Sequence, residues 1–259
     1  MNKHSRIQNS FKNQKAFVAY LTAGDGGIKH TLEAALALIK GGVTILEIGV
    51  PFSDPIADGP VIQRASQRAL KAGTTLPDIL WLTKEIRKKS DIPLILFSYL
   101  NPLLAATNTF FQEAKEAGID GALIVDCPLE ESKHIHKKCV TEGLAPIYVM
   151  TPATTLSRIM LINQQAEGFL YYACRRGTTG IRQTLPEDFA EKIQLIKANT
   201  HLPVVTGFGI STLTAATEVL RHADGVVVGS LFVKALEDGI TPAELTRLAR
   251  NINPLQKKR

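Results

Sequence analysis

The sequence has little of the chemistry that marks secreted, metal-binding or membrane-spanning proteins. Only three cysteines occur in 259 residues, Cys127, Cys139 and Cys174. Their odd number and unpaired spacing indicate neither a disulfide framework nor a zinc site. No apolar run reaches the roughly 18 residues of a membrane span, and the polar start MNKHSRIQNSFKNQK lacks the apolar stretch of a signal peptide. These absences favour a reducing, cytoplasmic location.

The composition is that of an ordinary soluble protein. Hydrophobic residues make up 45% of the chain and charged residues 21%, which argues against disorder. The net charge of +6 could favour anionic ligands, yet the lysines and arginines are scattered over predicted helix faces and the tail QKKR. We therefore interpret them as solvated surface charges and not as a nucleic-acid groove.

Short apolar runs alternate with amphipathic stretches along the whole chain. Eight runs are expected to form strands: Phe17–Leu21, Ile45–Gly49, Pro93–Phe97, Gly121–Val125, Ala145–Val149, Phe169–Ala173, Pro203–Val205 and Gly225–Val228. The intervening helical patterns include Thr31–Ile39, Leu76–Lys89, Thr109–Ala117, Glu130–Glu142, Pro186–Ala198 and Thr212–Leu220. Gly41, Gly118 and Gly143 close three of them in C-cap positions.

Eight strand–helix units in about 250 residues predict a (β/α)₈ TIM barrel. We expect a single domain, residues 1–259, with a short N-terminal helix and extra helices, because no linker or low-complexity segment interrupts the alternation. The competing fold is a doubly wound open sheet, which would need fewer strands or a second domain.

The segment ILEIGVPFSDPIADGP places two carboxylates in unusual surroundings. Glu47 is the only charge in the apolar strand, and alternation points it the same way as Ile45 and Gly49, towards an interior layer. One interpretation is a paired structural acid; the other is a proton-transfer group whose pKa burial raises. Asp58 ends the proline-rich loop that follows, where an Asp-Gly-Pro sequence is also typical of a turn or a helix start.

Glycines follow the late strands, at the edge where a barrel carries its active site. They occur in the segments RRGTTG, GFG and GS, which end in Gly180, Gly209 and Ser230. Glycine lets backbone N–H groups approach an anion, and Ser230 opens a predicted helix whose N-terminus favours negative charge. Each glycine pair alone is more often a tight turn. Together, on consecutive late strands, they predict a phosphate site.

The stretch ILEIGVPFSDPIADGPVIQ, with YLTAGD before it and GTTG, GFGIS and VVGS after it, resembles the tryptophan synthase alpha subunit family over nearly the whole chain. The resemblance implies cleavage of indole-3-glycerol phosphate to indole and glyceraldehyde 3-phosphate. It also implies a barrel that uses no cofactor of its own and pairs with a pyridoxal-phosphate beta subunit, with an alpha2beta2 tetramer expected. By motif position, Glu47 and Asp58 match the family's catalytic carboxylates.

The resemblance also implies the substrate-binding residues. Tyr20, Phe97, Leu123 and Phe208 match the indole pocket, Tyr171 matches a tyrosine near the reacting centre, and Thr179 matches the threonine of a mobile loop. Gly180, Gly209, Gly229 and Ser230 match the phosphate-binding positions. Pro51–Pro55, Asn101 and Pro128 are the expected contact rim for the beta partner. No metal is expected, because the indole ring itself can accept the electrons of the cleaved bond.

The chain departs from the family pattern at two loops. It reads AGDGG where the family usually has proline after the aspartate, and RRGTTG where the first threonine replaces a common valine and Arg176 a small residue. Neither change removes a proton-transfer group. Two other functions remain open: a non-catalytic activator of the beta subunit, and another phosphate-binding barrel enzyme of the tryptophan or histidine pathways, against which the Asp58 loop argues.

Overall fold

The computed structural model describes residues 4–174, 185–207 and 209–256. In these ranges it has nine strands: β1 Ala16–Thr22, β2 Ile45–Gly49, β3 Leu94–Ser98, β4 Gly121–Ile124, β5 Ala145–Ile147, β6 Val149–Met150, β7 Leu170–Ala173, β8 Val204–Gly207 and β9 Gly225–Val228. The helices are α1 Ser5–Phe11, α2 Ile28–Lys40, α3 Pro60–Lys71, α4 Leu76–Arg87, α5 Leu100–Leu104, α6 Phe110–Ala117, α7 Leu129–Thr141, α8 Leu156–Gln165, α9 Phe189–Lys197, α10 Leu213–His222, α11 Ser230–Glu237 and α12 Pro242–Ile252.

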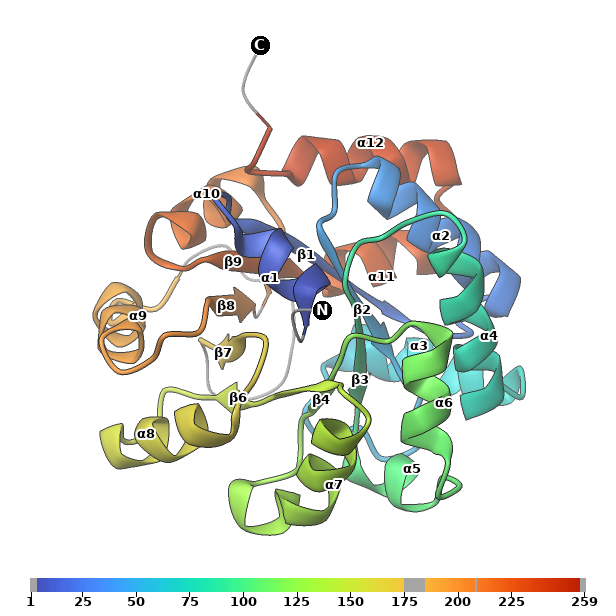
Figure 1. Cartoon of the computed structure of the whole chain (residues 1–259). Helices are drawn as coiled ribbons and strands as arrows, with labels where there is room; N and C mark the ends of the chain where they lie inside the picture. Colours follow the sequence, from blue (N-terminus) through green and yellow to red (C-terminus); the bar gives the residue numbers. More distant parts are fainter. Residues whose placement is uncertain (1–3, 175–184, 208, 257–259) are drawn as a thin grey trace.

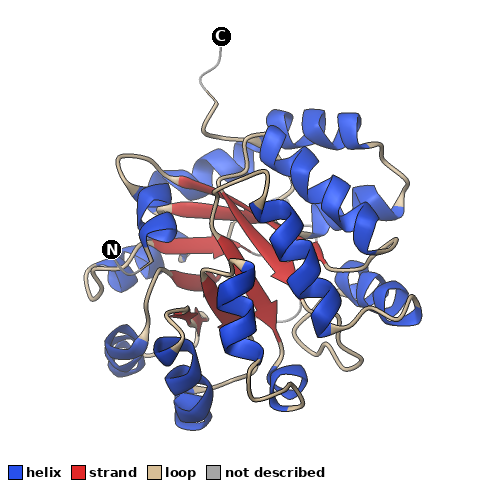
Figure 2. Ribbon diagram, turned by 45° about the vertical axis from the view of Figure 1, so that its right-hand side comes forward, coloured by secondary structure: helices blue, strands red, loops and turns tan. Residues whose placement is uncertain are grey.

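The strands form one parallel sheet that curls into a barrel surrounded by helices (Figures 1 and 2). The order of the strands is β5-β4-β3-β2-β1-β9-β8-β7-β6, so the two ends of the sheet are consecutive in the chain. This is the predicted TIM barrel, and the open doubly wound sheet is excluded. The predicted N-terminal helix and an extra helix are also present. α1 precedes the first strand, and α12 follows α11 without a strand between them.

The fifth predicted strand differs from the expectation of one continuous run. Ala145–Val149 is divided at Tyr148 into β5, which pairs with β4, and β6, which pairs with β7. At this point the chain stops pairing with β4 and begins to pair with β7, and this change of partner closes the barrel. The side chain of Tyr148 points outward, where its hydroxyl donates to Ser132 Oγ at 3.1 Å.

Alternating side chains divide the apolar interior into two layers. Residues on one face of each strand fill the barrel, among them Val18, Ile45 and Val205, while the other face packs against the helices. Ile7 of α1 belongs to the inner layer, so the short N-terminal helix covers one end of the barrel. Both faces of the strands are therefore buried, as is usual for parallel sheets.

Three glycines end helices in the left-handed conformation that favours this residue. Gly118 and Gly143 do so with φ of 104° and 71°, after α6 and α7. After α2 the left-handed residue is Gly42, with φ of 96°, whereas the expected Gly41 caps the helix in a right-handed conformation. No helix within the described ranges has the length and hydropathy needed to cross a membrane.

Candidate active site

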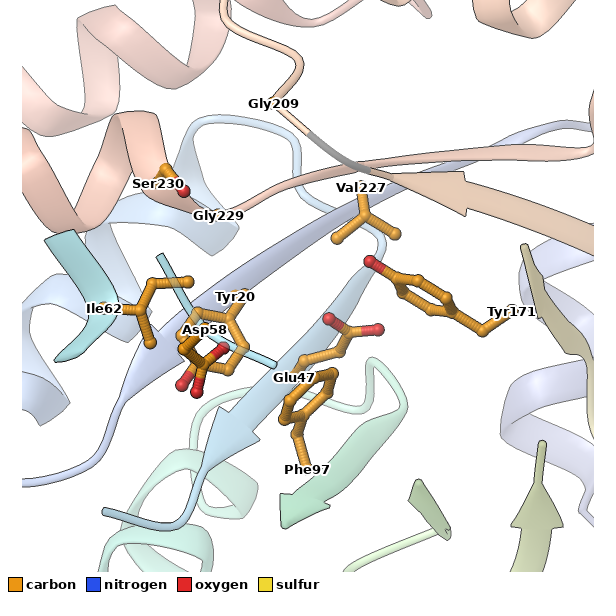
Figure 3. Close-up of a pocket in the computed structure, with 10 residues that line it drawn as sticks. All are labelled: Tyr20, Glu47, Asp58, Ile62, Phe97, Tyr171, Gly209, Val227, Gly229 and Ser230. Carbon is orange, nitrogen blue, oxygen red and sulfur yellow. The ribbon is translucent and has the colours of Figure 1, made fainter. Parts of the chain in front are cut away.

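A pocket of about 400 Å³, including the space at its open mouth, lies at the carboxyl ends of the strands. Figure 3 shows both carboxylates of the ILEIGVPFSDPIADGP segment pointing into it. The lining residues are Tyr20, Glu47, Asp58, Ile62, Phe97, Tyr171, Gly209, Val227, Gly229 and Ser230. These residues come from six strand–helix units, which meet at one edge of the barrel, where barrel enzymes carry their chemistry.

Glu47 lies in the middle of β2, with Tyr20 of β1 and Ile95 of β3 as its neighbours in the sheet register. Its side chain faces the barrel interior, as strand alternation predicts, and the residue is only 1% exposed. Within the described part of the chain, Glu47 Oε1 has no hydrogen-bond partner. Burial raises the pKa of Glu47 to about 8 because it removes the charged carboxylate from water.

Asp58 is 4% exposed and is held from behind by Tyr99. The Tyr99 hydroxyl donates to Asp58 Oδ2 at 3.0 Å and accepts the N–H of Ala57 at 3.0 Å. The N–H of Asp58 donates to Pro55 O at 2.9 Å, and Gln63 Nε2 donates to Asp58 O at 2.8 Å. These bonds fix the end of the proline-rich loop, so the carboxylate has a defined direction towards the pocket.

The surroundings of the two acids separate their pKa values. Burial raises the pKa of Asp58 to about 6, and the hydrogen bond from Tyr99 opposes that rise by stabilising the carboxylate. Among the described residues Glu47 Oε1 has no hydrogen-bond donor, and the pKa of Glu47 is about 8. Near pH 7 the pocket therefore holds one protonated acid and one anion, which is the combination that acid–base chemistry on a single substrate requires.

Aromatic rings line the pocket around the acids. Tyr20 and Phe97 pack edge to face with ring centroids 5.1 Å apart, and the Tyr20 hydroxyl lies 3.3 Å from Thr22 Oγ1. Tyr171 comes from β7 on the other side of Glu47, and burial together with the nearby Glu47 charge raises its pKa. Flat apolar walls of this kind suit a planar aromatic ligand.

The third side of the pocket is built of backbone. Gly229 is the N-cap of α11, and Ser230 is the first residue of that helix. The first N–H groups of a helix have no intrahelical partners, and the first turn of α11 has no acidic residue to occupy them. Gly209, with φ of 84°, lines the same side. The arrangement can bind an anion such as a phosphate.

The predicted site residues have different outcomes. Glu47, Asp58, Tyr20, Phe97, Tyr171, Gly209, Gly229 and Ser230 all line the pocket. Leu123 does not: it is fully buried in the inner layer of the barrel, among the packed side chains. Thr179, Gly180 and Phe208 lie outside the described residues, as do Arg175 and Arg176.

Three residues at the site were not predicted. Ile62 and Val227 line the pocket, and Tyr99 holds Asp58. Val227 belongs to the continuous apolar run GVVV, in which periodicity cannot distinguish the inner from the outer face. The position of Tyr99 at a strand end was the only signal for its role. A metal centre has no support in the described segments, where no group of three or more His, Cys, Asp or Glu side chains could hold an ion.

Comparisons with known proteins agree on one family. The family model described as tryptophan synthase alpha chain matches residues 7–258. The tryptophan synthase alpha chain of Coxiella burnetii (strain CbuK_Q154) is 56% identical over 250 residues, covering 96% of this chain and 98% of that protein. The corresponding protein of Chlamydia caviae is 48% identical over 256 residues, covering 97% of this chain and 100% of that protein. The solved alpha subunit from Legionella pneumophila str. Paris superimposes with a TM-score of 0.86 at 35% identity, covering 97% of each chain. The chain therefore belongs to the tryptophan synthase alpha chain family.

Proposed function

We propose that Glu47 and Asp58 carry out in this chain the reaction for which its family is known. That reaction is the cleavage of indole-3-glycerol phosphate to indole and glyceraldehyde 3-phosphate, a lyase step in tryptophan biosynthesis. The observation that carries the assignment is the pair of buried carboxylates with separated pKa values in one pocket. A pocket with aromatic walls and a helix N-terminus at its far side suits both ends of this substrate.

Glu47 is assigned both proton transfers. A retro-aldol cleavage needs a proton added to indole C3 and a proton removed from the hydroxyl on the adjacent side-chain carbon. With the carboxyl protonated near pH 7, Glu47 donates to C3, and the resulting carboxylate then accepts the hydroxyl proton. The C3–carbon bond breaks as the aldehyde forms, and its electron pair returns to the ring. The pKa of about 8 supports this assignment because proton transfer is most effective when the pKa of the group lies near the working pH.

Asp58 is assigned to the indole nitrogen. Protonation at C3 puts positive charge on the ring, and an ionised carboxylate that accepts the indole N–H stabilises that charge. The Tyr99 hydroxyl supports the role, since it both orients Asp58 and stabilises its ionised form. The phosphate is assigned to the N-terminus of α11, with Gly209, Gly229 and Ser230 around it.

The chain is an alpha chain, and its family implies a beta subunit as partner. We further propose an alpha2beta2 assembly in which the beta subunit, and not this chain, binds pyridoxal phosphate. Exposed apolar residues near the expected contact rim support docking there: Ile56 is 75% exposed and Leu104 is 57% exposed. Residues 1–259 are proposed to form one domain. The small and odd number of cysteines supports a reducing, cytoplasmic location.

Indole release from indole-3-glycerol phosphate tests the proposal. The native chain, Glu47→Gln and Asp58→Asn should each be assayed with and without a beta subunit. Both variants should lose at least about a hundredfold in kcat, the lower range for removal of a general acid–base group or a charge-stabilising group. Full activity in Glu47→Gln would contradict the proton-transfer role. A native chain that releases no indole even with its partner would instead favour the non-catalytic activator.

A further inference from the structure

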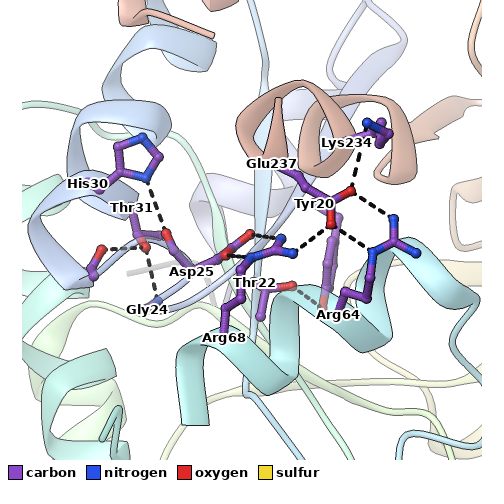
Figure 4. Close-up of polar contacts among 11 residues, drawn as sticks. Tyr20, Thr22, Gly24, Asp25, His30, Thr31, Arg64, Arg68, Lys234 and Glu237 are labelled. Carbon is purple, nitrogen blue, oxygen red and sulfur yellow. Dashed lines mark hydrogen bonds and ion pairs between the residues drawn. The ribbon is translucent and has the colours of Figure 1, made fainter. Parts of the chain in front are cut away.

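Asp25, the last residue of the YLTAGD segment, takes part in an ion-pair bridge outside the pocket (Figure 4). Arg68 Nε donates to Asp25 Oδ1 at 2.7 Å, and Arg68 Nη2 donates to Asp25 Oδ2 at 2.9 Å. The remaining Arg68 Nη1 donates to Glu237 Oε1 at 2.7 Å. We call Asp25, Arg68 and Glu237 the Arg68 bridge. One guanidinium thus joins two carboxylates from distant parts of the chain.

The bridge connects three neighbouring strand–helix units. Asp25 follows β1, Arg68 lies on α3 after β2, and Glu237 is the last residue of α11 after β9. β2, β1 and β9 are adjacent in the barrel, and the same three units supply Asp58, Tyr20 and Ser230 to the pocket. The bridge therefore ties together the units that hold the indole end and the phosphate end of the proposed substrate.

The helices α3 and α11 extend from the pocket to the bridge. From Pro60 to Arg68, α3 rises about 12 Å, and from Ser230 to Glu237, α11 rises about 10 Å. The two helices pack against each other, with Ile62 of α3 and Val233 of α11 buried in a small apolar cluster beside Tyr20. Their N-termini lie at the pocket. Their far ends are joined through Glu237, which binds both Arg64 and Arg68, and Arg68 alone extends the connection to Asp25.

The geometry of the bridge is that of a fixed contact. The contact with Asp25 is bidentate, which gives a guanidinium–carboxylate pair its directional rigidity, and the Asp25 side chain is only 8% exposed. The contact with Asp25 raises the pKa of Arg68. Hydrogen bonds from Arg64, and then from Arg68, lower the pKa of Glu237 to about 2, so the Glu237 end of the bridge stays ionised across the working pH range.

We propose that Arg68 is a positioning residue that sets the spacing between Asp58 and the N-terminus of α11, and so selects a ligand with an indole N–H and an anion at that separation. Asp58 precedes α3 by two residues, and Ser230 begins α11, so a shift of one helix along the other changes this spacing directly. The inference rests on the function proposed for the pocket.

The test compares a ligand that spans the pocket with ligands that occupy one end. The spanning probe is an uncleavable analogue in which a propyl chain joins indole C3 to phosphate. The probes for the two ends are glycerol 3-phosphate and indole-3-propanol. Linking two binding groups raises affinity only when the sites are at the matching distance. Arg68→Met should weaken binding of the spanning analogue by at least about tenfold, because a displacement of about 1 Å can have a larger effect than this. Binding of each end probe should weaken by less than about threefold.

Arg64→Met is the matched control. Arg64 also lies on α3 and binds Glu237 through Nε and Nη2, both at 2.7 Å, so the substitution removes two charged hydrogen bonds but leaves the Arg68 bridge in place. Its affinity for the spanning analogue should stay within about twofold of the native chain, as expected for a largely exposed ion pair. Equal losses in Arg64→Met and Arg68→Met, or equal losses for spanning and end probes, would overturn the proposal.

A second variant covers the possibility that unpaired Asp25 disturbs folding in Arg68→Met. Glu237→Ala keeps the part-buried Asp25–Arg68 pair and removes the hydrogen bonds from both Arg64 and Arg68 that hold the end of α11. The same selective loss for the spanning analogue is therefore expected. A folded Glu237→Ala chain with native affinity for that analogue would overturn the proposal. Failure of the native chain to release indole would count against the proposed function and not against this proposal. The two tests are separate, because the probe affinities are measured without turnover.

Discussion

Replacing Glu47 by glutamine should change how the stability of the chain depends on pH. The pKa of Glu47 is about 8 in the folded chain against an ordinary value of 4.5, and burial is the cause. Below pH 4.5 the carboxyl is protonated in both states and contributes no pH dependence. Between pH 4.5 and 8 the folded state keeps a proton that the unfolded state has released, so the free energy of unfolding falls as the pH rises.

The expected size of the effect follows from the shift. Each pH unit within the window lowers the free energy of unfolding by about 1.4 kcal/mol, which accumulates to about 3 kcal/mol at pH 7 and about 5 kcal/mol at pH 9. Glutamine at position 47 removes this dependence. The buried amide has its own cost, but that cost does not change with pH. The test is therefore how the difference in free energy of unfolding between the variant and the native chain changes with pH.

Urea unfolding of both proteins at pH 5, 6, 7, 8 and 9 measures this difference. Glu47→Gln should gain stability relative to the native chain by several kcal/mol between pH 5 and 8, with little further gain above pH 8. Glu33→Gln, at an exposed position of α2, controls for the loss of one carboxylate and should stay within about 0.5 kcal/mol of the native chain. Parallel pH profiles for Glu47→Gln and the native chain would refute the inference that burial holds Glu47 protonated near pH 7.

Three further predictions concern the pocket. The pH profile of kcat/KM should be bell-shaped with limbs near 6 and 8, because activity needs an ionised Asp58 and a protonated Glu47. Tyr99→Phe removes the donor to Asp58 and should move the acidic limb up by about one pH unit, whereas an unmoved limb would contradict the orienting role. Gly229→Ala should raise KM about tenfold and change kcat less. The added Cβ would lie 3.3 Å from Tyr20 Cβ and so would displace the N-cap of α11, where the phosphate is proposed to bind. Inhibition by glycerol 3-phosphate should weaken in parallel, and an unchanged inhibition constant would place the phosphate elsewhere.

The local sequence pattern was sufficient to predict the direction and burial of the Glu47 side chain. Its direction follows from alternation within a five-residue strand, and a buried charge without a neighbouring cation in sequence already pointed to a raised pKa; the structure confirms the burial and the shift. Asp58 was different, since its sequence is equally typical of a helix start. In the structure α3 begins two residues after Asp58 with Gly59 as its N-cap, and Asp58 itself lines the pocket, so its catalytic role stays a prediction.

The partners of these residues could not be predicted from local pattern. Tyr99 is 41 residues from Asp58, and Arg68 is 43 residues from Asp25 and 169 from Glu237. Contacts over such separations are decided by the order of strands around the barrel, which periodicity does not specify. The division of the fifth strand at Tyr148 has the same origin, since it depends on the two different neighbours that the closing segment must pair with.

The distribution of these contacts implies that activity and stability respond to different residues. Barrel stability rests on the two apolar layers, which surround all the strands and have no part in the Arg68 bridge. The spacing across the pocket rests on three adjacent units joined far from the reacting atoms by a partly exposed ion pair. Partly exposed pairs contribute little to the free energy of folding, yet a small displacement of a bound substrate can strongly reduce its reactivity. Substitutions at the Glu237 end of the bridge should therefore lower kcat/KM by a larger factor than their small effect on unfolding would suggest.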